Sequence, residues 1–315
     1  MKNELLRFLS HSLLLVFAIS ILGRTVYSSD RDLVRFKQEY PKALARFDEA
    51  LSHVKAKGHA GNIDDYVIII QNKLKKIVRI HSKSKEGEKP IPEHEFAMVI
   101  GKNYAFQAAK HYNEGSQFVL TDLYKNSDQP AASLANKEES EFIAKGGNYI
   151  YCSYMTKNIN LKFFLDSGYY KILSCKLEND AAVIRFTNAN SASSRFTGEM
   201  ELLPKRNWAL RKLTLDVSAP VTRIRSKNQD SASLKSTTTV EYGEEADGIP
   251  MPKSIRIEGE KDGPNTCTFD EFALGAQFSE SEFTPRHFGL PDVDSPATDP
   301  QRVRQRILAG CSIWG

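Results

Sequence analysis

The sequence lacks the residue patterns that usually mark a catalytic or metal site. Its four cysteines stand apart, with no C-x-x-C pair, so the spacing typical of a structural zinc site is absent. It also contains no H-E-x-x-H, G-x-S-x-G or glycine-rich phosphate-loop motif. We therefore expect a non-catalytic protein with no cofactor and no bound metal. An enzyme whose catalytic groups converge from distant positions is the alternative.

Histidines and carboxylates with metal-ligand spacing are also scarce. The seven histidines are scattered, and the Glu93-His94-Glu95 triplet falls in a segment that we interpret as a charged surface loop. Asp292, Asp294 and Asp299 resemble part of a calcium loop but lack its glycine and its bidentate glutamate. Solvated surface charge explains both patterns better than metal ligands do.

A strong excess of charge of one sign is missing too. The 43 lysines and arginines are nearly balanced by 39 aspartates and glutamates, which leaves a net charge of +4 on 315 residues. Such a balance predicts no general affinity for nucleic acid. The basic run at residues 73–89 is interpreted as a solvated strand face that leads into a Lys/Glu-rich loop. Aromatic residues make up 10% of the chain, which excludes overall disorder.

The first 28 residues have the layout of a signal peptide. Lys2 and Arg7 precede an apolar run that ends at Leu22, and small residues follow near Ser28. The apolar run is shorter than the roughly 20 residues of a spanning helix, so cleavage near Ser29 is favoured over a retained anchor. We expect export to the periplasm or cell envelope, with membrane contact only through this segment. In an exported chain one disulfide is possible, with Cys152 and Cys175 closest in sequence; buried free thiols are the alternative.

Residues 29–60 show helical periodicity. Large apolar residues recur every three or four positions, which predicts an amphipathic helix that packs on an apolar sheet face; they are Leu33, Phe36, Tyr40, Leu44, Phe47, Leu51 and Val54. Pro41 marks a possible kink, and Gly58 and Gly61 are expected to end the helix. A membrane-surface helix is disfavoured because its polar faces carry as much acid as base.

Residues 61–294 read mainly as short strands separated by turns, with a possible aromatic-rich helix at 148–167. Residues 295–315 are expected to be a flexible tail. The hairpin at 198–217, GEMELLPKRNWALRKLTLDV, organises this region. Its second arm switches the parity of its apolar residues, which predicts a β-bulge near Arg211 and Lys212 and therefore a bent strand. The fold class predicted is α+β, with a strongly curved antiparallel β-sheet (a half-barrel) wrapped on the N-terminal helix.

Four blocks of sequence carry a resemblance to known proteins. NYAFQAAKHYNEGSQFVLTDL, the Pro204–Trp208 hairpin, VEYGEEADGIPMPKSI and FTPRHFGLP resemble an exported bacterial family of unknown function. The order of helix and strands is similar to the half-barrel of periplasmic lipoprotein carriers. No functional residue of those carriers aligns with this chain, so the resemblance implies a fold and a carrier-like role but no site residue.

The resemblance implies that the concave sheet face binds a lipid, an acyl chain or a lipidated partner. Candidate residues for lining an apolar cavity are Phe106, Phe118, Phe163, Met200, Trp208 and Leu215. The alternative is an envelope scaffold with a fully packed core that binds proteins through its sheet edges and loops. The sequence leaves the ligand and the oligomeric state open.

Overall fold

The structure is a computed structural model that divides the chain into two compact units. It describes residues 31–292 except 62–63, 84–89, 103, 114–116, 126–141, 143–144, 157–158, 162–167, 169, 189–194, 219–232 and 260–264. The first unit holds the chain up to Leu44 together with Leu161–Ser236, and the second holds Ala45–Asn160 together with the chain from Thr237. The expected signal peptide (1–28) and tail (295–315) lie outside the described residues.

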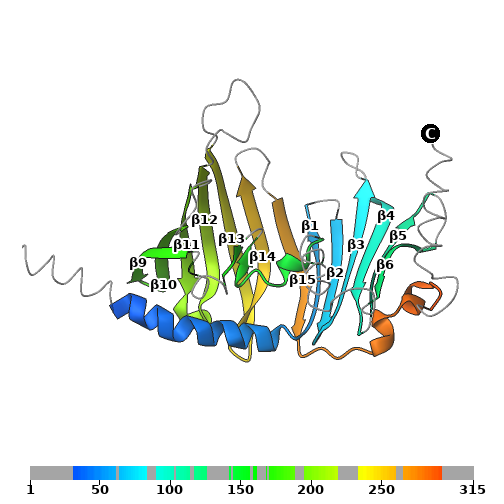
Figure 1. Ribbon diagram of the computed structural model, residues 1–315, viewed down its shortest axis with the longest axis horizontal. Coiled ribbons are helices and arrows are strands. Elements are labelled where there is room, and N and C mark those ends of the chain that lie inside the picture. Colours follow the sequence, from blue (N-terminus) through cyan, green and yellow to red (C-terminus); the bar gives the residue numbers. More distant parts are fainter. Residues whose placement is uncertain are drawn as a thin grey trace, which may run out of the picture. The chain divides into compact units, whose positions relative to one another are not determined.

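An α-helix spans residues 31–50 and is continuous through Pro41 (Figure 1). Phe36, Tyr40, Leu44 and Phe47 of the predicted stripe are buried, which confirms its helical spacing. The expected helix over 29–60 is nevertheless too long, because β1 (His53–Ala60) follows directly after a turn. Along β1 buried residues such as Val54 and Ala56 alternate with more exposed ones, which is the period of a strand. Both edges of β1 pair with other strands, β2 and β15. Two backbone ladders thus override the helical spacing of Val54.

The first unit contains a four-stranded antiparallel meander among its described residues. Its strands lie side by side in chain order, β9 (Tyr170–Glu178), β10 (Ala181–Asn188), β11 (Arg195–Leu203) and β12 (Ala209–Ser218) (Figure 1). β9 and β10 are joined by a two-residue turn in which Asn179 has a φ of 55°. Asparagine tolerates this left-handed conformation, so the turn follows from its sequence.

The predicted bulge in the central hairpin is confirmed. Glu201 pairs with Lys212, whereas the next residue, Leu202, pairs with Leu210, so Arg211 is the extra residue of β12. This insertion lets Leu210 and Leu213 both be buried although their parities differ. Arg211 itself points to acids, with Nη2 lying 2.9 Å from Glu201 Oε2. The bulge therefore keeps apolar residues on one face and bends the strand.

The second unit contains an antiparallel sheet with the strand order β6-β5-β4-β3-β2-β1-β15-β14-β13. The remaining bounds are β2 (Asp64–Gln71), β3 (Leu74–Lys83), β4 (Ile91–Ile100), β5 (Tyr104–His111), β6 (Val119–Lys125), β13 (Ser233–Ala246), β14 (Ile249–Gly259) and β15 (Asn265–Leu274). Pairing of β1 with β15 joins the run β6 to β1 to the run β15 to β13. β6, at one end of this order, has only one neighbour among the described strands, so the sheet is not closed.

Segments outside the sheet cover both of its faces in the second unit. The strap, defined here as residues 275–290, carries the short helices η5 (Glu280–Phe283) and η6 (Pro285–Phe288) and buries Phe283 and Leu290 against β2 and β4–β6. On the opposite face, Tyr149 packs against Tyr66 with ring centroids 5.5 Å apart. Neither face of this sheet is therefore left entirely to solvent.

The aromatic-rich helix expected at 148–167 is not formed where the structure describes this segment. A single turn, η2 (Gly147–Tyr149), is followed by the short strands β7 (Met155–Thr156) and β8 (Ile159–Asn160). A Cβ on Gly147 would lie 2.3 Å from the Phe142 ring, so the chain turns back on itself at this point. The buried aromatic residues Tyr151 and Tyr154 are placed by tertiary contacts and not by helical spacing.

Charge introduced beneath the helix should destabilise the protein. Leu44→Asp or Phe47→Asp is expected to lower the free energy of unfolding by about 3–5 kcal/mol, because each places an unpaired carboxylate in a buried site. Val34→Asp is the matched control, since Val34 is 53% exposed on the same helix. Urea denaturation measures all three. Equal stability of Phe47→Asp and Val34→Asp would show that the helix is not packed as described.

A methyl group at Gly198 should also destabilise the first unit. Gly198 pairs with Phe186 across β10 and β11, and a Cβ there would lie 2.3 Å from the Phe186 ring. Gly198→Ala is therefore expected to cost about 1–3 kcal/mol of unfolding free energy by overpacking. Gly259→Ala, which meets no atom within 4 Å, is the control. Phe186→Leu in the Gly198→Ala background should recover part of the loss in thermal denaturation, and a merely additive loss would contradict this account.

Candidate functional site

An aromatic cluster joins the helix to the sheet in the first unit. It consists of Phe36, Tyr40 and Trp208, all almost completely buried. The Phe36 ring stacks on Tyr40 with centroids 4.9 Å apart, and Trp208 lies 5.6 Å from Phe36 and 6.4 Å from Tyr40. Phe36 and Tyr40 are four residues apart, so both project from one helix face onto the same indole. This aromatic cluster is where the helix contacts the end of the central hairpin.

Trp208 occupies an unusual backbone conformation. Pro204 starts a short helical turn, η3 (Pro204–Arg206), after which Asn207 and Trp208 both adopt left-handed φ angles of 53° and 55°. Asparagine accepts this conformation readily, but for a bulky residue it costs on the order of 1–2 kcal/mol. Packing of the indole beneath the helix supplies the compensating stabilisation. The turn thus holds Trp208 in place at an energetic cost.

Polar contacts at the rim fix the helix over the sheet. Trp208 Nε1 donates to Glu39 Oε2 at 3.1 Å, and Asn207 Nδ2 donates to the Ala43 carbonyl at 3.3 Å. Asp32 accepts a hydrogen bond from the backbone N–H of Leu177 at 3.0 Å. The hydrogen bond from Arg35 to Glu39 lowers the pKa of Glu39, against an opposing effect of burial, so its carboxylate remains an acceptor for the indole.

The hydroxyl of Tyr40 stands out within this contact. Its side chain is 0% exposed, yet its oxygen has no hydrogen-bond partner among the described residues. Burial raises the pKa of Tyr40, so the phenol stays neutral and can donate a hydrogen bond. An unsatisfied buried hydroxyl costs about 1–3 kcal/mol. Phenylalanine at this position would provide the same ring without that cost.

The sequence-predicted cavity residues fall into two groups. Met200, Trp208 and Leu215 belong to the central hairpin of the first unit, with Met200 fully buried and Leu215 half-buried opposite Gly198. Phe106 and Phe118 belong to the second unit, where both pack edge-on against Phe288, at centroid distances of 5.7 and 5.2 Å. Phe163 lies outside the described residues.

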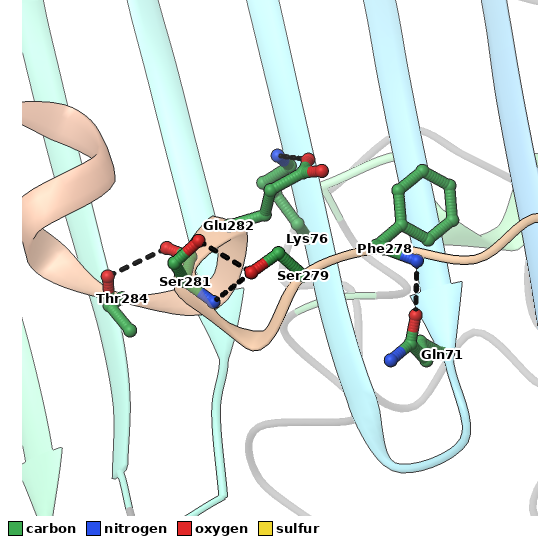
Figure 2. A network of polar contacts seen from close by, with 7 residues as sticks. All are labelled: Gln71, Lys76, Phe278, Ser279, Ser281, Glu282 and Thr284. Carbon is green, nitrogen blue, oxygen red and sulfur yellow. Dashed lines mark hydrogen bonds and ion pairs between the residues drawn. The ribbon is translucent and has the colours of Figure 1, made fainter.

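The strap that covers Phe106 is held by a network of polar contacts (Figure 2). Phe278 N–H donates to Gln71 Oε1 at 2.7 Å, and the buried Lys76 Nζ donates to Glu282 Oε2 at 2.9 Å. Ser279 accepts from the N–H of Ser281 at the start of η5. Sequence reasoning missed this cover, although the FTPRHFGLP block contained its three apolar anchors, Phe283, Phe288 and Leu290.

The described cysteines carry no reactive thiol. Cys152, Cys175 and Cys267 are free and buried, so the possible Cys152–Cys175 disulfide is absent and the free-thiol alternative is confirmed for these three. Burial raises the pKa of Cys175 and of Cys267 to about 12. A protonated, buried thiol is a poor nucleophile, which argues against thiol chemistry here. Cys311 lies outside the described residues.

Three histidines form a ladder across β3, β4 and β5. His81 pairs with His94 and His94 with His111, and the ring centroids are 4.7 and 6.0 Å apart. Asp64 accepts a hydrogen bond from His81 Nδ1 at 2.8 Å. No cluster in the described part of the chain has the convergent geometry of a metal centre. The ladder escaped sequence reasoning because its members are separated by 13 and 17 positions along the chain.

The histidine ladder should make stability depend on pH. Burial, followed by the charge of His81, lowers the pKa of His94, while Glu93 opposes this effect and His111 and Arg79 add to it. The unfolded chain then binds more protons, so stability is complete above the ordinary pKa near 6.5 and falls as the pH drops below it. Urea unfolding between pH 7.5 and 5.5 should show a smaller pH dependence in His94→Gln than in the wild type. His59→Gln is the control, because His59 is only half-buried and lies on β1, outside the ladder, and an unchanged slope in His94→Gln would contradict the assignment.

Comparison with known proteins found structural neighbours only. No protein-family model and no curated protein matches the chain. A LolA superfamily protein from Nitrosomonas europaea is 11% identical, with a TM-score of 0.35, and the alignment covers 79% of this chain and 99% of that one. A DUF1329 family protein from Desulfovibrio piger is 9% identical, with a TM-score of 0.33 and coverage of 80% and 98%.

LprF from Mycobacterium bovis also aligns, at 11% identity and a TM-score of 0.25, over 80% of this chain and 97% of that one. All three neighbours are at most 11% identical to this chain. Their TM-scores are too low for any functional residue to be carried over to this chain. In the described residues no helix is long and apolar enough to cross a membrane.

Proposed function

We propose that this protein is a non-catalytic cell-envelope protein that binds a lipid, an acyl chain or a lipidated partner. The binding surface is the apolar face of the first unit's sheet, the concave face of a half-barrel wrapped on the N-terminal helix. One observation carries the proposal, namely that the helix covers this face through side-chain packing and a few rim hydrogen bonds. The helix contributes no strand to the sheet, so it can move without breaking a backbone ladder.

The four strands of the first unit supply apolar side chains for a long ligand chain to contact. Around Trp208 the four strands bury apolar side chains, among them Ile184, Phe186, Met200, Leu202, Leu210 and Leu213. Burial contributes roughly 0.8 kcal/mol per methylene, so a sixteen-carbon chain gains on the order of 10 kcal/mol. Displacing helix side chains costs about 1.5–3 kcal/mol each. Long chains therefore offset the displacement of a helix side chain such as Phe36, whereas short ones do not.

The edge strands disfavour the alternative of a scaffold that pairs with partners through sheet edges. In β9 the pairing skips Leu173, because Arg185 pairs with Ser174 and Phe186 with Ile172. In β6 it skips Thr121, because Gln107 pairs with Asp122 and Ala108 with Leu120. A bulge twists an edge and interrupts the ladder that an added strand would need. Both edges in the described part of the chain are therefore poor templates for strand addition.

Tryptophan fluorescence tests the proposal. A long-chain lipid that enters beside Trp208 should change its emission in a saturable way, and the change should be lost in Trp208→Phe. Palmitic acid below its aggregation concentration is the probe, and hexanoate is the short-chain control because its burial energy is too small. Trp314, which lies outside the described residues, should contribute little to the change.

An independent measurement keeps the test free of spectroscopic artefacts. Displacement of a fluorescent fatty acid should report the same apparent affinity for palmitic acid in the wild type. If neither method detects saturable binding of any long-chain lipid, the carrier proposal is wrong. The burial of Phe106 and the burial of Met200 then each reflect a fully packed core. The scaffold alternative replaces the carrier proposal.

A further inference from the structure

We infer that the Tyr40 hydroxyl recognises a carbonyl oxygen on the ligand, so that the ligand is an acyl compound such as an ester or amide and not a bare hydrocarbon. This inference rests on the proposed function and names the chemical class that the first unit's site accepts. It concerns the single hydroxyl that the helix places between Phe36 and Trp208.

The Tyr40 hydroxyl is buried and unsatisfied among the described residues. Tyr40 is completely buried, and its oxygen has no hydrogen-bond partner among the described residues. The other polar groups at this contact are already engaged, since Trp208 Nε1 donates to Glu39 and Asn207 Nδ2 donates to the Ala43 carbonyl. Buried polar groups are almost always paired, so an orphan requires an explanation.

In the missing hydrogen bond the Tyr40 hydroxyl is the donor. Tyr40 is neutral, because burial raises its pKa, and its oxygen lies in an aromatic environment with no donor or acceptor partner. A phenol in such a place donates to an incoming acceptor. Carbonyl oxygens of esters and amides supply that acceptor where an acyl chain joins its head group.

A matched pair of ligands tests this inference. Methyl palmitate and octadecane have similar length and differ in the ester group, and both can be delivered from cyclodextrin in a displacement assay. The wild type should bind methyl palmitate about tenfold more tightly than octadecane, which corresponds to about 1.4 kcal/mol. Tyr40→Phe should bind the two ligands equally, with little change in its affinity for octadecane.

Thermal stability without ligand provides a second readout. Tyr40→Phe removes an unsatisfied group, so its melting temperature should be equal to or higher than that of the wild type. Tyr154→Phe is the matched control, because the Tyr154 hydroxyl donates to Asp48 Oδ1 at 2.9 Å and its removal should lower the melting temperature. A clear loss of stability in Tyr40→Phe would show that the hydroxyl is satisfied by buried water, and would overturn the inference.

The outcomes separate this inference from the proposed function. If the wild type binds both ligands equally, the site accepts apolar chains but Tyr40 does not select a carbonyl, and only the inference fails. If the wild type binds neither ligand, the proposed function fails and the inference falls with it. Preference for the ester in the wild type together with its loss in Tyr40→Phe supports both.

Discussion

This structure depends on one constraint. Segments that do not belong to the sheet must cover its apolar faces. An antiparallel sheet can leave one face to water, but here apolar residues on both faces of β2 are buried. The helix meets this need in the first unit through Phe36 and Tyr40. The strap and residues around Tyr149 meet it in the second unit. Among the described residues, neither cover adds a strand to the sheet.

The central hairpin shows how several local features serve that constraint together. The bulge at Arg211 keeps Leu210 and Leu213 buried, while the left-handed turn at Asn207 and Trp208 directs the indole beneath the helix. Each feature carries a local cost, and packing against the helix offsets it. The Tyr40 hydroxyl is the exception, because it has no hydrogen-bond partner among the described residues. That imbalance is why we assign it to a ligand.

Much of the strand layout could be predicted from the sequence. The turns at Asn72, Asn179 and Asp247 all have positive φ angles, as their residue types favour, and the strands on either side follow the alternation of apolar residues. The bulge near Arg211 was predictable because a parity switch is visible in the order of residues alone. The helix was predictable up to residue 50, where local periodicity and tertiary packing agree.

The failures occur where one pattern fits two structures. Val54 continues the helical stripe, yet it also lies two positions from Ala56, which is the spacing of one strand face. Only pairing with β2 and β15 makes Val54 a strand residue. The aromatic residues after Gly147 have helical spacing, but contacts with other parts of the chain hold them in turns. Periodicity alone cannot choose between such structures, because the deciding hydrogen bonds and contacts are distant in sequence.

In the candidate site, too, some features follow from the sequence and others from the tertiary structure. Local pattern alone determined which residues of the helix and the hairpin are apolar, and therefore that Tyr40, Met200 and Trp208 would be buried. Tertiary structure decided what covers them: the helix over Trp208, the strap over Phe106, and nothing within hydrogen-bonding reach of the Tyr40 hydroxyl among the described residues. The physical reason is that alternation reports which side of an element avoids water. The identity of the covering segment depends on contacts between residues more than a hundred positions apart.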